Sequence, residues 1–187
     1  NFEGYTLTMG YKYKSKYWID LNTAYNGTDR FGKNNRFGFF PAIGIGYAIS
    51  EENFFKNVDW LEKNVQLLKI RASYGLVGSD VAAGNRYLYE QVYKENGNYP
   101  FGDYPGDTPV IKEGDLGTPS VTWEKAKKLD IGLDMNLFNK VSFTLDYFLD
   151  KRYDQLVTRA DVPLIIGIGY APSTVARTTN QGFDGQI

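Results

Sequence analysis

Apolar and polar residues alternate regularly along residues 123–150. Apolar side chains occupy the odd positions of 129–137 and again of 141–147, while the even positions between them carry polar, charged or glycine residues. A period of two indicates β-strands, and the short break at 138–140 indicates a hairpin between them. Both strands of this hairpin are therefore expected to have one apolar and one polar face.

The apolar row is long for a strand of a soluble sheet. Soluble strands average about 5–6 residues, whereas the first limb of the hairpin carries an apolar band nine residues long, 129–137. A tilted strand that crosses a bilayer needs about 9–11 residues. The leading hypothesis is therefore the wall of a transmembrane β-barrel, with the apolar face against lipid and the polar face toward the lumen.

The same alternation recurs in four further segments. Residues 5–13 and 17–25 form a second hairpin pattern around the break at 14–16, and 37–49 follows with small residues on its even positions. In 66–76 the apolar side chains move to even positions. The predicted lipid-facing positions are the odd ones of 5–25, 37–49 and 129–147 and the even ones of 68–76.

The connections between these segments fall into two length classes. Two are tight, 14–16 and 138–140, and three are long and rich in Gly, Asp, Asn and Pro, namely 26–36, 77–120 and 151–179. Bacterial barrels have short periplasmic turns and long outer loops. Placing the tight turns in the periplasm puts every long loop outside.

Residues 50–64 are a periplasmic connection in this scheme. Ser50-Glu51-Glu52 is typical of a helix start, and the apolar residues after it have roughly helical spacing: Phe54, Phe55, Val58, Trp60 and Leu61. We expect a short capped helix here. The predicted fold is all-β, antiparallel and up-and-down, with about seven spanning segments: 5–13, 17–25, 37–49, 66–76, 121–137, 141–150 and one from about 181.

The parity of the apolar positions also predicts strand register. Outward residues lie on odd positions at both sides of each tight turn, which requires three-residue turns with Tyr13 opposite Tyr17 and Leu137 opposite Val141.

Four charged residues on the polar faces are candidate lumen groups: Lys69, Arg71, Asp130 and Asp134. Consecutive strands pair in an up-and-down barrel, so the strands that flank the 77–120 loop should be neighbours. Aligning their apolar bands predicts that Arg71 lies close to Asp134 and Lys69 close to Asn136, within a stagger of two residues. Such pairs keep the register, or the charges simply solvate the interior; the pattern leaves both explanations open.

Composition restricts the function. The 187 residues include no Cys and no His, which removes disulfides, thiolate ligands and the commonest general base. The net charge of −1 offers no electrostatic footprint for nucleic acid. Asp130 and Asp134 are better explained as a solvated lining than as a glycosidase pair, and 103–107 as a turn rather than a calcium site. We expect neither an enzyme nor a cofactor.

Seven strands cannot close a bacterial barrel, because such barrels use an even number. Asn1-Phe2-Glu3 does not begin a signal peptide, and no apolar run reaches the ~18 residues of a membrane helix. We therefore expect the chain to be a fragment of a larger barrel, with its export signal outside the fragment.

Five ordered stretches resemble the barrel wall of SusC/RagA-type TonB-dependent outer-membrane transporters. They are 36–54 (RFGFFPAIGIGYAISEENF), 67–80 (LLKIRASYGLVGSD), 121–124 (VTWE), 130–134 (DIGLD) with 146–148 (DYF), and 180–184 (NQGFD). Together they extend over nearly the whole chain. Tyr47 and Asp184 stand where the family often has Trp and Glu, and neither difference affects the fold.

The resemblance implies a transporter whose barrel of about 22 strands surrounds an N-terminal plug. It also implies import of glycans, oligosaccharides or peptides across the outer membrane of a Gram-negative bacterium, with a SusD-like lipoprotein as lid and energy from the TonB complex. Residues 1–187 are then a partial barrel domain, without the plug and the remaining strands. Tyr99, Phe101 and Tyr104 of the 77–120 loop become candidate contacts to ligand or lid, and ordinary loop packing is the alternative explanation.

Two other functions are compatible with the pattern. A passive porin has the same kind of wall but no plug, so the residues upstream of Asn1 distinguish it. A soluble all-β adhesion or carbohydrate-binding module buries its apolar face in a core and stays in solution without detergent.

Overall fold

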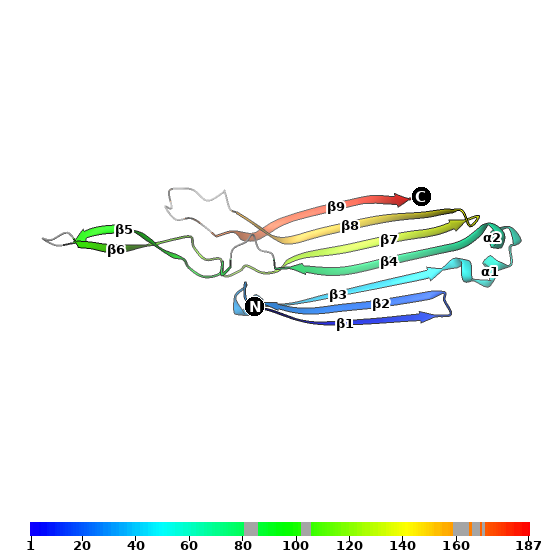
Figure 1. The fold of residues 1–187 in the computed structure, drawn as a ribbon, viewed down its shortest axis with the longest axis horizontal. Coiled ribbons are helices and arrows are strands. Elements are labelled where there is room, and N and C mark those ends of the chain that lie inside the picture. Colours follow the sequence, from blue (N-terminus) through cyan, green and yellow to red (C-terminus); the bar gives the residue numbers. More distant parts are fainter. Residues whose placement is uncertain (81–85, 102–105, 159–164, 166–168, 170) are drawn as a thin grey trace.

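Seven strands form one antiparallel sheet in the computed structural model, which describes residues 1–80, 86–101, 106–158, 165, 169 and 171–187 (Figure 1). The strands are β1 (Phe2–Tyr13), β2 (Tyr17–Thr28), β3 (Phe37–Ala48), β4 (Val65–Ser79), β7 (Glu124–Leu137), β8 (Val141–Val157) and β9 (Ser173–Gln186). They lie side by side in chain order, with β1 and β9 at the edges. The predicted all-β, up-and-down arrangement is confirmed.

Both tight turns have the predicted register. Tyr13 pairs with Tyr17, and Leu137 pairs with Val141. In each turn the first two residues have positive φ values: Lys14 48°, Ser15 54°, Phe138 56° and Asn139 52°. The backbone bends back on itself within three residues, which preserves the parity of the apolar positions across each hairpin.

Cross-strand partners form unbroken rows through the whole sheet. One row is apolar: Tyr11, Ile19, Ile45, Ala72, Ile131, Tyr147 and Phe183. The next row lies on the opposite face: Lys12, Trp18, Gly46, Arg71, Gly132, Asp146 and Asp184. The predicted shift from odd to even positions in β4 is therefore confirmed, because Ala72 lies in register with odd residues on both neighbouring strands.

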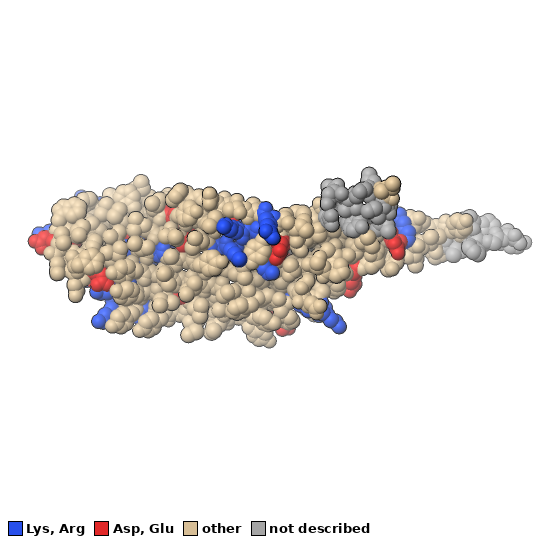
Figure 2. All heavy atoms as spheres, turned by 180° about the vertical axis from the view of Figure 1, so that it is seen from behind, with Lys and Arg blue, Asp and Glu red and all other residues tan. Residues whose placement is uncertain are grey.

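The apolar face has no covering layer in the described part of the chain. Many of its large side chains are exposed, from 37% for Leu21 to 77% for Phe183, and others, such as Leu133 and Tyr147, are half-buried between their neighbours. Uncharged side chains also cover most of the sheet when the molecule is viewed from behind (Figure 2). A soluble sandwich buries such a face against a second sheet, and no second sheet packs on this face among the described residues.

A small core lies where β3 and β4 separate. These strands pair only between Ala42–Ala48 and Lys69–Gly75. Beyond that point loop residues fill the space around Phe40, and the buried cluster consists of Phe31, Phe40, Leu88, Val121, Trp123 and Ala171. Leu76, which was expected on the lipid face, packs against this cluster, because the pairing of β3 with β4 ends at Gly75.

The 77–120 loop contains a hairpin that the sequence pattern did not predict. β5 (Tyr93–Phe101) pairs with β6 (Gly106–Glu113), and this hairpin extends well beyond one end of the main sheet (Figure 1). Its alternation is interrupted at Gly97, where φ is 73° and the pairing shifts. β8 and β9 also extend further toward this end than expected, so the last strand begins at Ser173 rather than near residue 181.

The predicted helical connection exists, but its expected start is wrong. A 3-10 turn (Ile49–Glu51) precedes α1 (Asn53–Lys56) and α2 (Asp59–Asn64), and a further 3-10 turn, Lys33–Asn35, lies in the 26–36 loop. No side chain caps α1 or α2. The Glu52 carboxylate, which stands at the N-cap of α1, binds Lys16 and Tyr17 instead. No helix among the described residues is long and apolar enough to cross a membrane.

Candidate functional site

Arg71 lies at the centre of a carboxylate cluster on the polar face of the sheet. Its Nη2 donates to both oxygens of Asp146 at 2.6 and 2.7 Å. Its Nη1 lies 3.3 Å from Asp130, and its Nε lies 3.3 Å from Asp134. The sequence predicted the contact to Asp134, whereas Asp146, the partner with the shortest distances, was missed.

Glycine at position 132 makes the contact between Arg71 and Asp146 feasible. Arg71 on β4 is paired with Gly132 on β7, and Gly132 is paired with Asp146 on β8. A Cβ at position 132 would lie 2.6 Å from Arg71 Cζ and would collide with the Asp146 carboxylate. The guanidinium therefore lies across β7 in the space that a side chain would fill.

Lys69 makes a similar crossing in the opposite direction. Its Nζ lies 4.8 Å from the centroid of the Trp18 ring, within the range of a cation–π contact. Gly46 lies on the strand between them, and a Cβ there would lie 3.2 Å from Lys69 Cε. Two cations on β4 thus pass over glycines to reach partners two strands away.

The predicted partner of Lys69 needs a correction of two residues. Lys69 is paired with Asp134, and Asn136 is paired with Leu67. The difference equals the stagger that the apolar bands left open. The offset is the same from Leu67 to Ser79, so the whole pairing is displaced, and the bulge between Val65 and Leu67 changes the register only at Val65.

A shallow hollow lies beside the cluster on the same face. Its volume is about 210 Å³, and its lining includes Trp18, Asp20, Gly46, Lys69, Arg71 and Asp130. An aromatic ring next to charges of both signs offers hydrogen bonds and a flat apolar contact to a polar solute or to a packed protein segment. In the described ranges no group of His, Cys, Asp or Glu is arranged to hold a metal ion.

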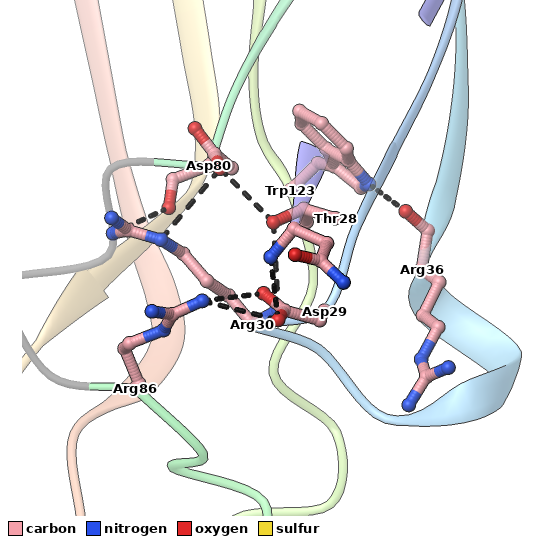
Figure 3. A network of polar contacts seen from close by, with 8 residues as sticks. Thr28, Asp29, Arg30, Arg36, Asp80, Arg86 and Trp123 are labelled. Atoms are coloured by element: carbon pink, nitrogen blue, oxygen red, sulfur yellow. Dashed lines mark hydrogen bonds and ion pairs between the residues drawn. The ribbon is translucent and has the colours of Figure 1, made fainter. Parts of the chain in front are cut away.

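A second polar network fastens the loops at the far end of the sheet (Figure 3). Thr28 Oγ1 donates to Asp80 at 3.1 Å, and Arg30 Nε lies 3.7 Å from the same carboxylate. Arg86 Nη2 donates to both oxygens of Asp29 at 3.0 and 3.1 Å, and this carboxylate raises the pKa of Arg86. The 26–36 loop therefore holds Asp80 and Arg86, which lie on the two sides of residues 81–85.

Trp123 connects this network to the buried cluster. Its ring packs edge-on against Phe31 at 5.6 Å and Phe40 at 5.2 Å between centroids. Its Nε1 donates to the Arg36 carbonyl oxygen at 3.1 Å. Sequence reasoning included Trp123 in a spanning strand, but its side chain is only 2% exposed and serves as the centre of a loop core.

Two of the aromatic loop candidates, Tyr99 and Phe101, belong to β5 of the hairpin that extends beyond one end of the main sheet (Figure 1). Tyr99 is 60% exposed on β5. Phe101 ends that strand opposite Gly106, and Tyr104, like most of the 103–107 turn, lies outside the described residues. The hairpin also exposes Tyr93 and Ile111.

The whole chain, residues 1–187, matches the family model described as "TonB dependent receptor-like, beta-barrel". The chain belongs to the TonB-dependent receptor family. TonB-dependent receptor P39 of Formosa agariphila is 32% identical over 181 residues, which cover 96% of this chain and 16% of that protein. TonB-dependent receptor SusC of Bacteroides thetaiotaomicron is 30% identical over 160 residues, which cover 83% of this chain and 15% of that protein.

Solved structures of RagAB share the fold of this chain. The RagAB peptide importer in its closed-closed state superimposes with a TM-score of 0.80 at 22% identity, covering 98% of this chain and 19% of that one. The RagAB peptide transporter gives a TM-score of 0.82 at the same identity. The chain spans about a sixth of the length of its SusC and P39 relatives. TonB-dependent receptors are transport proteins rather than enzymes.

Proposed function

We propose that this chain is part of the barrel wall of a SusC-like TonB-dependent transporter in the outer membrane of a Gram-negative bacterium. The observation that carries this proposal is the uncovered apolar face, which continues through all seven strands and is exposed in the described chain. Lipid is the environment that such a face requires. Residues 1–187 are then a partial barrel domain, and the plug and remaining strands lie outside it.

The orientation follows from the lengths of the connections. The tight turns and the 49–64 linker lie at one end, and the loop core and the β5–β6 hairpin lie at the other (Figure 1). Short turns face the periplasm in bacterial barrels, so the hairpin points outward. The polar face then lines the lumen, with Lys69, Arg71, Asp130 and Asp134 as lumen groups.

The Arg71 cluster maintains the register of the wall and sets its local charge. One guanidinium faces three carboxylates, so the cluster is acidic overall. Its side chains are between 21% and 37% exposed, which leaves them in contact with lumen water. Because water screens these ion pairs, they contribute little to the free energy of unfolding, and their main effects are on strand register and on the local charge.

The imported solute is a glycan, an oligosaccharide or a peptide, taken up with a SusD-like lipoprotein and energy from the TonB complex. Similarity to SusC and to a RagAB peptide importer supports this class of cargo and partner. Tyr99 supports a role for the β5–β6 hairpin as an outer contact to ligand or lid, because exposed aromatic rings are common at such contacts. Phe101 and Tyr104 belong to the same proposed contact.

Uptake by the full-length transporter tests this function. A deletion strain should lose import of labelled oligosaccharide or labelled peptide, and the intact gene should restore it only when TonB is present. Import that continues in a strain without TonB would instead indicate a passive porin. Recovery of the full-length protein in the aqueous fraction without detergent would indicate a soluble module.

A further inference from the structure

The helical linker, residues 49–64, exposes large apolar side chains at the turn end of the sheet. Phe54 is 62% exposed, Val58 46% and Trp60 64%, whereas Phe55 is buried at 4%. The linker lies beside the hairpin turns rather than over the sheet (Figure 1). Phe55 is thus buried, Ile49 and Leu61 are half-buried, and the three exposed side chains have no cover in the described chain.

The linker is fixed to the apolar face rather than to the polar one. Tyr13, Tyr17 and Tyr47 form a row of rings on that face, with centroids 6.5 and 5.1 Å apart. The Tyr17 hydroxyl donates to Glu52 at 3.0 Å, and Lys16 Nζ lies 3.0 Å from the same carboxylate. The linker therefore continues directly from the aromatic edge of the face that the proposed function places against lipid.

Three of the six charged side chains of the linker, Glu51, Glu52 and Lys56, form ion pairs among the described residues. Lys56 pairs with Glu51 at 2.7 Å, and Asn64 Nδ2 donates to the Trp60 carbonyl oxygen at 2.8 Å. Paired charges and bonded carbonyls lower the cost of contact with a bilayer interface. The linker has four acidic and two basic side chains, so it has no cationic surface to attract anionic lipid.

We propose that the helical linker is an interfacial anchor that inserts Phe54, Val58 and Trp60 among zwitterionic phospholipids of the periplasmic leaflet. Trp and other aromatic side chains favour the headgroup boundary, where an apolar ring and a polar group are both accommodated. Continuity with the tyrosine row selects lipid as the occupant over a soluble partner. This inference rests on the proposed function, which supplies the orientation and the lipid-facing side.

Fluorescent labels in the full-length protein test the anchor. The protein is reconstituted in nanodiscs of phosphatidylethanolamine and phosphatidylcholine, after replacement of cysteines elsewhere in the full chain. An NBD label is placed at Phe54→Cys or Trp60→Cys. The matched control is Glu62→Cys, an exposed position in the same linker, and Ile43→Cys in the middle of the apolar face reports on the wall itself.

Quenching by spin-labelled phosphatidylcholine should be at least twofold stronger at positions 54 and 60 than at 62, with the strongest effect from a label near the headgroup. Iodide in solution should show the reverse order. Iodide quenching at 54 and 60 equal to that at 62 overturns the anchor, and so does protection from both quenchers, which indicates a protein contact. Lipid quenching at Ile43→Cys separates these results from failure of the barrel wall, which would leave position 43 unquenched.

Discussion

The guanidinium of Arg71 on β4 binds the carboxylate of Asp146 on β8, although β7 runs between these strands. The contact is bidentate from one nitrogen, and Gly132 provides the space for it. Arg71 therefore joins β4 to β8 through Asp146 and to β7 through Asp130 and Asp134, in addition to the backbone hydrogen bonds of these strands. This relationship makes a glycine on the middle strand a determinant of the cluster.

Substitution of Gly132 by alanine should break this crossing. The new Cβ occupies the place of the guanidinium, so Arg71 must withdraw from Asp146, and we expect a loss of about 1 kcal/mol or less in unfolding free energy, because water screens this partly exposed ion pair. Denaturant unfolding of the full-length protein in detergent measures it. Gly44→Ala is the matched control, because a Cβ there meets only Asp20 Cβ at 3.8 Å; equal effects of both variants would contradict the explanation.

Arginine substitutions on β2 distinguish the two faces of the wall. Leu21 pairs with Met9 and Ile43 on the apolar face, midway between tyrosine-containing rows at either end. Leu21→Arg should therefore cost about 2–4 kcal/mol in a bilayer, as arginine does near the midplane. Asn22→Arg, on the next position and the opposite face, should cost much less. Refolding titrations into liposomes give both values, and a larger penalty at Asn22 would reverse the face assignment.

Acid should weaken the attachment of the helical linker. Hydrogen bonds from Lys16 and Tyr17 lower the pKa of Glu52 below its ordinary value. Such a carboxylate stabilises the folded protein fully when the pH is above its pKa in the unfolded chain, near 4.3. This stabilisation is lost as the pH falls through the lower pKa of the folded state. Between pH 7 and a pH below the pKa of Glu52, the unfolding free energy of the wild-type protein should therefore decrease more than that of Glu52→Gln.

Glu62→Gln is the control for this pH dependence. Glu62 is exposed, and its side chain makes no hydrogen bond to another described residue. Its variant should retain the acid sensitivity of the wild type. Identical pH profiles for wild type and Glu52→Gln would show that the contacts of Glu52 do not hold the linker.

Truncation of Trp123 should release the outer loops while the sheet stays folded. Trp123→Ala removes the centre of the loop core, and a buried Trp→Ala change typically costs about 3–5 kcal/mol. Limited proteolysis of intact outer membranes should then cleave the 26–36 and 77–120 loops faster. Tyr93→Ala, on an exposed position of β5, should leave the cleavage rate of the 26–36 loop unchanged.

The sequence was sufficient to predict the sheet because each spanning strand has different environments on its two faces. Alternation of this kind determines both the face of each side chain and the parity of the turns, so the Tyr13–Tyr17 register followed directly. The β5–β6 hairpin was missed because most of its described side chains are exposed, whichever way they point, and because Gly97 interrupts its pattern. Strands whose two faces are similarly exposed do not need alternating apolar and polar residues, so the sequence pattern does not reveal them.

The candidate site was predicted only to the level of neighbouring strands. Arg71 and Asp134 lie on adjacent strands, so aligning apolar bands was enough to bring them together. Asp146 lies one strand further, and its contact depends on the missing side chain of Gly132 rather than on any property of the charged residues. A pattern of side chains therefore could not predict this contact, because Arg71 reaches Asp146 through the space that Gly132 leaves empty.

Glycine at positions 46 and 132 also affects the shape of the lumen. Lys69 and Arg71 lie flat along the wall, because each passes over a strand that presents no side chain at the crossing. Cations that stood upright would narrow the channel and present free charge to whatever lies inside it. A wall with its cations held flat remains thin while keeping its charge, so it takes up little of the width of the proposed lumen.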